Sequence, residues 1–146
     1  MRRRDFMKII GGAVAGWPPA ATAQQDGRER RIGLLNIAAD DPDGQENVAV
    51  FLQTLRQLGW AESRSTRIET RWAAGNAAEI RRHAAELVAV APDVIVATGT
   101  AAMGPLLEAT RTIPIVFANV ADPVGAGYID SMARPGGNAT GFLQFE

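Results

Sequence analysis

Six small or polar residues follow apolar stretches of the chain, and their types are suited to binding a small ligand. They are Asn36, Thr98, Gly99, Thr100, Asn119 and Asp122. Hydroxyls and backbone amides at the start of a helix can hold a carboxylate, and an aspartate can accept hydrogen bonds from an ammonium group. A small zwitterion such as an amino acid would satisfy both features. The same residue types are also common helix caps, so a purely local capping role is the alternative.

Strands and helices in alternation would position these residues. Apolar runs predict strands over residues 31–37, 66–73, 92–100 and 112–123, and helical spacing predicts helices over residues 47–59, 77–90 and 103–110. A short helix is an option for residues 123–132. This order predicts an α/β fold with a doubly wound parallel sheet. Right-handed crossovers bring the carboxyl ends of all strands to one edge, where open α/β sheets bind ligands.

Several finer features of these elements also follow from the sequence. Ile68, Thr70 and Trp72 alternate with charged residues, which predicts a strand near the sheet edge, and Trp72 is expected to pack rather than bind. The stretch 92–100 predicts a strand that is buried on both faces and ends in small polar residues. Asn76 is expected to cap the following helix, and His83 is expected on its solvated side.

Composition excludes several classes of function. The chain has 146 residues, 47% of them hydrophobic and 21% charged, with no cysteine, one histidine and its only lysine at Lys8. Thiolate or histidine metal sites, a Ser-His-Asp triad and a P-loop therefore lack their parts, and no glycine-rich dinucleotide loop follows the first predicted strand. We expect no catalytic residue, metal or cofactor. Without residues 1–23 the chain carries 11 basic and 15 acidic residues, net −4, so nucleic acid is not an expected partner.

The first 23 residues have the pattern of an export signal. A basic start is followed by a short apolar stretch and by Ala21 and Ala23, which form a small-x-small cleavage site. Arg3, Arg4 and Phe6 match the twin-arginine pattern, and a Sec signal is the alternative. We expect a soluble, periplasmic protein after the signal is removed. Residues 24–30 form a polar linker.

Six segments, in this order, resemble a known family. They are RRRDFMKIIGGAVAGWP, IGLLN, RWAAGN, DVIVATGT, TIPIVFANVADPV and ARPGGNATGF. The chain resembles the N-terminal half of ABC transporter substrate-binding proteins of the TrpX-like group, which have the type I periplasmic-binding-protein fold. The resemblance implies a two-lobed protein that holds an amino acid or similar small molecule between its lobes and delivers it to a membrane permease. It also implies that six residues face the ligand: Asn36, Thr98, Gly99, Thr100, Asn119 and Asp122.

The resemblance also sets the expected domain boundaries. Residues 31–137 would form the N-terminal lobe, and residues 138–146 would begin a hinge strand to a second lobe, with the chain truncated at this first crossing. The implied hinge residues are Gly136, Gly137, Asn138 and Gly141. The alternative function is a truncated gene product without activity, which folds as a lone lobe or self-associates. An exported flavodoxin-like enzyme is disfavoured, because no nucleophile-base pair or phosphate loop is present.

Overall fold

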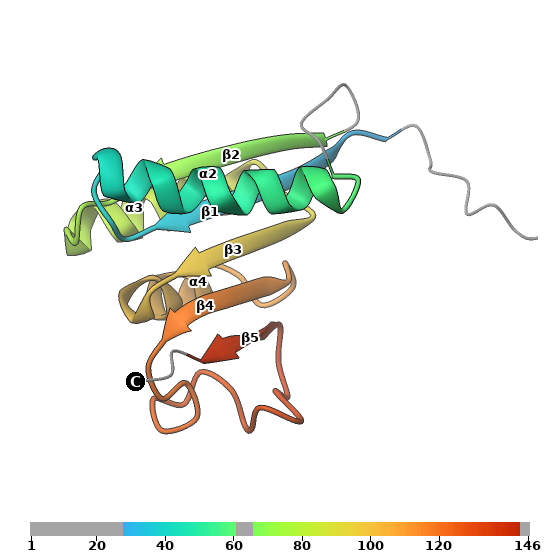
Figure 1. The fold of residues 1–146 in the computed structure, drawn as a ribbon. Coiled ribbons are helices and arrows are strands. Elements are labelled where there is room, and N and C mark those ends of the chain that lie inside the picture. The colour runs from blue at the N-terminus through green and yellow to red at the C-terminus, as the bar shows by residue number, and fades with distance from the viewer. Residues whose placement is uncertain (1–27, 61–65, 144–146) are drawn as a thin grey trace, which may run out of the picture.

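The computed structural model describes residues 28–60 and 66–143. The predicted export signal, part of the predicted linker and the last three residues lie outside these ranges. The described residues form one five-stranded sheet in the order β2-β1-β3-β4-β5, and every neighbouring pair is parallel (Figure 1). The α/β fold with a parallel sheet is therefore confirmed.

The element bounds agree with the predicted alternation. The strands are β1 (Arg30–Asn36), β2 (Thr66–Trp72), β3 (Val94–Thr98), β4 (Ile115–Val120) and β5 (Ala139–Leu143). The helices are α2 (Pro42–Gln57), α3 (Ala77–Ala89) and α4 (Met103–Ala109), and a 3-10 turn, η2 (Thr100–Ala102), precedes α4. Strand β2 lies at an edge of the sheet, as its alternating pattern predicts. The chain winds outward in opposite directions from β1 and β3, which makes the gap between these two strands a topological switch point.

The main hydrophobic core lies between the sheet and helices α3 and α4 (Figure 1). Alternate residues of β3 and β4 point into it, and Ile95, Ala97, Ile115 and Phe117 are all fully buried. On β1, the side chain of Leu87 from α3 approaches Gly33, leaving little room for a larger residue there. This packing fixes the back of the sheet and therefore the positions of the strand ends.

Helix starts are set by capping residues more than by the apolar pattern. Helix α2 begins five residues before its predicted start, because Asp41 accepts a hydrogen bond from Gly44 N and Pro42 occupies the first turn. Asn76 caps α3 by accepting from Ala78 N and Glu79 N, as predicted. The apolar stripe of α2 begins only at Val48, so helical periodicity does not indicate its polar first turn.

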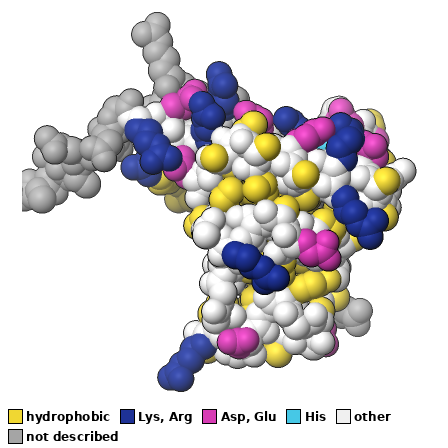
Figure 2. All heavy atoms as spheres, turned by 180° about the vertical axis from the view of Figure 1, so that it is seen from behind, with side chains coloured by type: hydrophobic (Ala, Val, Ile, Leu, Met, Phe, Trp, Pro, Cys, Tyr) yellow, Lys and Arg dark blue, Asp and Glu magenta, His cyan; other side chains and the backbone are white. Residues whose placement is uncertain are grey.

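The expectation of a solvated His83 is wrong. The residue is 8% exposed and lies on the inner side of α3 with Ile80 and Leu87. Position 83 is three residues after Ile80 and four before Leu87, so it belongs to the same helical face. Its ring nitrogens lie near the carboxylates of Glu79 and Glu86, which provide polar partners. In Figure 2 the His side chain shows as a small patch among Lys/Arg and Asp/Glu side chains.

The prediction that β3 is buried on both faces is also wrong. Helix α2 lies in front of β1 and β2 only, and within the described ranges no helix covers the front of β3, β4 and β5 (Figure 1). We call this surface the open face. Its side chains are half-buried or exposed, and they are Val94, Val96, Val116, Ala118, Thr140 and Phe142.

Residues 123–127 form turns and not the short helix considered from the sequence. Gly127 adopts a φ of +74°, a left-handed conformation that a right-handed helix does not contain. The segment is held instead by a turn in which Asp122 Oδ1 accepts from Gly125 N at 2.8 Å. Residues 123–138 therefore reach β5 as an irregular connection.

Candidate functional site

The predicted ligand residues lie at the carboxyl ends of three adjacent strands. Asn36, the last residue of β1, is in register with Thr98, the last residue of β3. Thr98 is in register with Ala118 of β4, the residue before Asn119. The sheet therefore brings residues 21 to 83 positions apart in the sequence to one edge. This edge also contains the switch point between β1 and β3.

Asn36 and Thr98 are joined by a direct hydrogen bond. Asn36 is 6% exposed, and its Oδ1 accepts from Thr98 Oγ1 at 2.8 Å and from Ala38 N at 3.0 Å. A buried amide with two donors on one oxygen is held in a single orientation. The two residues therefore act as one unit and not as two independent contacts.

The turn after β3 is shaped by Gly99 and tied to β4. Gly99 has φ +86° and ψ 151°, a conformation almost confined to glycine, and its amide donates to Ala118 O at 2.9 Å. Thr100 Oγ1 accepts from Ala121 N at 3.0 Å. Among the hydrogen bonds of the described residues, the amides of Thr100 and Ala101 have no acceptor, because they begin the η2 turn.

Two residues at the carboxyl end of β4, one within the strand and one just after it, adopt left-handed backbone conformations that are uncommon outside glycine. Asn119 has φ +55° and Asp122 has φ +40°. Both side chains are exposed at the same edge as Asn36. Strained backbone of this kind tends to occur at binding sites, where it aims groups at a ligand, and Asn and Asp tolerate it better than most residues.

The capping alternative holds for part of the set. Thr100 and Asp122 each accept a hydrogen bond from a nearby backbone amide, so one oxygen of each is committed to holding its own loop. Asp122 keeps its second carboxylate oxygen, and the side chain of Asn119 has no hydrogen bond among those of the described residues. The six residues are therefore a mixture of loop-holding groups and groups with free hydrogen-bonding capacity.

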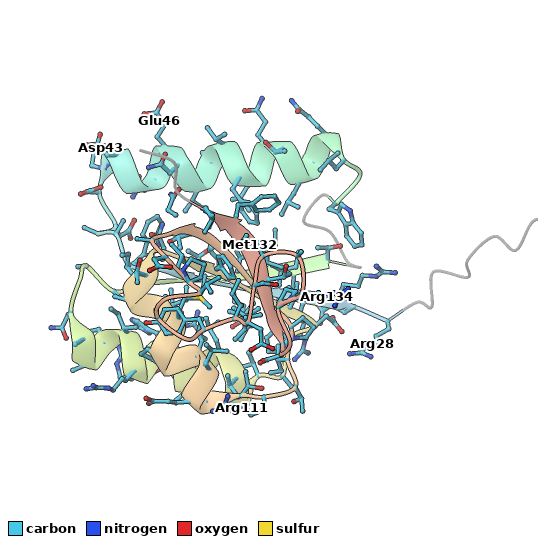
Figure 3. The ribbon with its side chains drawn as sticks, turned by 90° about the horizontal axis from the view of Figure 1, so that it is seen from below. Arg28, Asp43, Glu46, Arg111, Met132 and Arg134 are labelled. Carbon is cyan, nitrogen blue, oxygen red and sulfur yellow. The ribbon has the colours of Figure 1, made fainter. Side chains whose placement is uncertain are left out.

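Acidic side chains surround this edge. Asp43 and Glu46, in the first turns of α2, lie on the same side of the molecule as the carboxyl ends of the strands, whereas Arg28 and Arg134 lie on the opposite side (Figure 3). Asp40, Asp41 and Asp122 add to the acidic edge. An acidic rim attracts a cationic group such as an ammonium, and the amide donors of the strand ends suit an anionic oxygen.

The implied hinge residues lie elsewhere in the sheet. Gly136, Gly137 and Asn138 line a shallow hollow with Arg111 and Pro114, at the end of the sheet where β4 and β5 begin. Asn138 Nδ2 donates to Ile113 O at 2.8 Å, which fixes the entry into β5. Gly141 lies within β5 against the ring of Phe117, so a side chain there would collide with it. The predicted ligand residues therefore lie at the carboxyl ends of the strands, and Gly136, Gly137 and Asn138 lie at the opposite end of the sheet.

The sequence did not indicate the bond between Asn36 and Thr98, or the part played by the Ala38 amide. The signal that would have revealed the bond is the register of β1 with β3, which the apolar pattern does not encode. In the described ranges, no group of three or more His, Cys, Asp or Glu side chains is arranged to hold a metal ion. The same ranges contain no helix with the length and hydropathy needed to cross a bilayer.

Comparison with known proteins gives consistent matches. Residues 35–145 match the family model described as ABC transporter substrate binding protein. A tyrosine-binding protein of Clostridioides difficile (strain R20291) is 27% identical over 114 residues, which are 78% of this chain and 33% of that protein. A conserved domain protein from Vibrio cholerae O1 biovar El Tor matches with a TM-score of 0.74 and 31% identity, over 81% of this chain and 40% of the other.

A second similar solved structure is a complex with an amino acid. It is an ABC domain in complex with L-Trp from Streptococcus pneumonia, with a TM-score of 0.70 and 27% identity. The match covers 79% of this chain and 38% of that one. The chain thus spans between a third and two fifths of the length of these relatives.

Proposed function

Because this chain belongs to the family of ABC transporter substrate-binding proteins, we propose that it supplies one ligand-binding lobe of an exported receptor for an amino acid. The observation that carries the proposal is the gathering of Asn36, Thr98, Asn119 and Asp122 at one edge of the sheet. In this proposal the ligand lies between that edge and a second lobe, and a membrane permease receives it. The relatives' length, more than twice that of this chain, is consistent with a two-lobed receptor.

The amino-acid class is supported by the chemistry of the edge. The backbone amides of Thr100 and Ala101, which have no acceptor among the described residues, suit a carboxylate, and the free oxygen of Asp122 with the acidic rim suits an ammonium. A tyrosine-binding and a tryptophan-bound protein are among its relatives. We therefore take L-tryptophan and L-tyrosine as the first probes.

Nuclear magnetic resonance titration of the purified, 15N-labelled chain tests this proposal, because it detects weak binding by a single lobe. We expect L-tryptophan or L-tyrosine to shift the resonances of residues 98–101 and 119–122. Asp122→Asn, which keeps the loop-holding oxygen and removes the charge, should weaken the response. Glu108→Gln removes an exposed acid near the end of α4, outside the acidic rim, and serves as the matched control. Shifts confined to other parts of the sheet would refute the amino-acid proposal.

Export through the twin-arginine route is a separate part of the proposal. Replacement of Arg3 and Arg4 by lysine should abolish the appearance of the protein in the periplasmic fraction, because that route requires the arginine pair. Arg2→Lys is the control, since it keeps the pair and the total charge. Undiminished export of the double variant would indicate the Sec route.

A second candidate is a chain that does not act as a receptor and associates with itself. The observation in its favour is the open face, on which Phe142 is 72% exposed. Large exposed apolar side chains on a sheet face favour association with another surface.

A further inference from the structure

The orientation of the Asn36 amide is determined by its surroundings. Ala38 N lies 3.0 Å from one terminal atom of this side chain, and a backbone N–H can only donate, so that atom must be the oxygen Oδ1. The Thr98 hydroxyl, 2.8 Å from the same atom, must then donate as well. A flipped amide would place its NH2 group against two donors. The nitrogen Nδ2 is therefore held on the other side.

The Nδ2 group is the part of Asn36 that reaches solvent. It has no hydrogen bond to any described residue, and the residue as a whole is 6% exposed. No fully buried side-chain nitrogen or oxygen of the described residues lacks a partner. An unpaired Nδ2 must therefore be accessible at the end of β1. Asn36 is a side chain more than nine-tenths buried whose one free group is an accessible donor at the end of β1.

We infer that Asn36 is a fixed hydrogen-bond donor for the carboxylate of the ligand, and that Thr98 is a positioning residue that acts through Asn36. This inference rests on the proposed function and adds the polarity of ligand binding to it. The Thr98 hydroxyl proton is committed to Asn36, so the threonine offers the ligand no donor of its own. The carboxylate lies toward β1 and β3, and the ammonium lies toward Asp122 beyond β4. An amide donor forms a stronger hydrogen bond with a charged carboxylate than with a neutral acceptor.

The test uses Asn36→Asp in the full chain, with L-tryptophan and tryptamine as probes. Asp keeps the shape of the side chain and both accepted hydrogen bonds, and it replaces the outward donor with an acceptor. We expect affinity for L-tryptophan to fall at least tenfold, because the new oxygen repels the carboxylate, while tryptamine, which has no carboxylate, binds about as well as to the wild type. Equal weakening of both probes, or of neither, would overturn the inference.

Thr98 variants test the positioning role. Thr98→Val removes the hydroxyl with little change in shape and should lower L-tryptophan affinity about three- to tenfold, the typical effect of one hydrogen bond. Thr98→Ser keeps the hydroxyl and should restore binding. The side-chain NH2 resonances of Asn36 should shift on binding in the wild type and in Thr98→Ser, and much less in Thr98→Val. A valine variant that binds like the serine variant would refute this role.

The resonance shifts also distinguish a failure of the inference about Asn36 from a failure of the proposed amino-acid binding. If L-tryptophan shifts residues 98–101 and 119–122 but leaves the Asn36 NH2 unchanged, the inference fails and the proposed function stands. If L-tryptophan and L-tyrosine shift no residue of this edge, the amino-acid function fails, and the inference fails with it.

Discussion

At the scale of single residues, the edge formed by the carboxyl ends of the strands is shaped by backbone conformations that few side chains tolerate. Gly99 adopts φ +86° and ψ 151°, and a Cβ built on it would lie 2.6 Å from Ile37 Cγ1. Asn119 and Asp122 hold left-handed conformations at the same edge. Folding energy from the core must offset this local strain. The edge is thus more sensitive to substitution than its exposure suggests.

Gly99→Ala should lower the free energy of unfolding by about 1–3 kcal/mol, through backbone strain and contact with Ile37. Urea denaturation followed by circular dichroism would measure the change. Gly137→Ala is the control, because its surroundings are open and its φ is not positive, and its effect should stay within about 0.5 kcal/mol. Equal effects of the two substitutions would contradict the strain argument.

Charged residues around His83 give stability a dependence on acid pH. A hydrogen bond from Arg82 lowers the pKa of Glu79. The pKa of Glu86 is lowered mainly by a hydrogen bond with His83 and to a smaller extent by Arg82. A carboxyl whose pKa is lower in the folded state stabilises the fold above its ordinary pKa. That contribution is lost as the pH falls through the folded-state pKa.

We therefore expect the Tm of the wild type to fall more steeply below about pH 4.3, the ordinary pKa of glutamate, than that of the Glu79→Gln, Glu86→Gln double variant. Thermal melting from neutral to acid pH would measure both slopes. Glu46→Gln, on α2 and away from the cluster, is the control (Figure 3). Parallel curves for the wild type and the double variant would show that these ion pairs contribute nothing.

At the scale of elements, α3 depends on its cap as well as on its apolar stripe. Asn76 satisfies two amides of the first turn, at 2.9 Å and 3.1 Å. The helix then packs Ile80, Ala84 and Leu87 against the sheet. The cap sets where the helix begins, and the stripe sets which face turns inward.

Asn76→Ala should therefore lower the free energy of unfolding by about 1 kcal/mol. Asn76→Asp, which retains an accepting oxygen and adds a favourable charge at the helix start, should be neutral or slightly stabilising. Chemical denaturation of the three proteins would measure the differences. A loss as large for aspartate as for alanine would mean that the cap is not what holds this turn.

At the scale of the whole molecule, the sheet is covered unevenly. Helices α3 and α4 bury its back, whereas α2 covers only β1 and β2 in front (Figure 1). The open face therefore exposes apolar groups of three strands, with Phe142 the most prominent. A second lobe or another copy of the chain would each reduce this exposure.

If the chain exists without further partners, it should self-associate with increasing concentration. Phe142→Ser should reduce the association measured by sedimentation velocity, because it removes the largest apolar side chain of the open face. Val50→Ser is the control, since Val50 is 58% exposed on α2 and away from this face. A wild-type chain that stays monomeric at all concentrations would contradict the second candidate function.

The alternation of strands and helices, the parallel sheet and the residues at each strand end were predictable from the sequence. Apolar periodicity is a local property, and right-handed crossovers then leave little freedom in where the strands end. The burial of His83 could also have been predicted, because it shares its helical face with Ile80 and Leu87. The first turn of α2 was missed because its residues are polar and its cap acts through hydrogen bonds.

Only the tertiary structure decided how the site residues are used. The register of β1 with β3 places the Thr98 hydroxyl on Asn36, 62 positions away, and that contact leaves the amide with one free donor. The tertiary structure also shows that Thr100 and Asp122 each use one side-chain oxygen to accept a hydrogen bond from a backbone amide of the loops at this edge. Side-chain hydrogen bonds between strands that are distant in sequence depend on the strand register and on how deeply the side chains are buried. Neither property can be predicted from the composition or periodicity of a single segment.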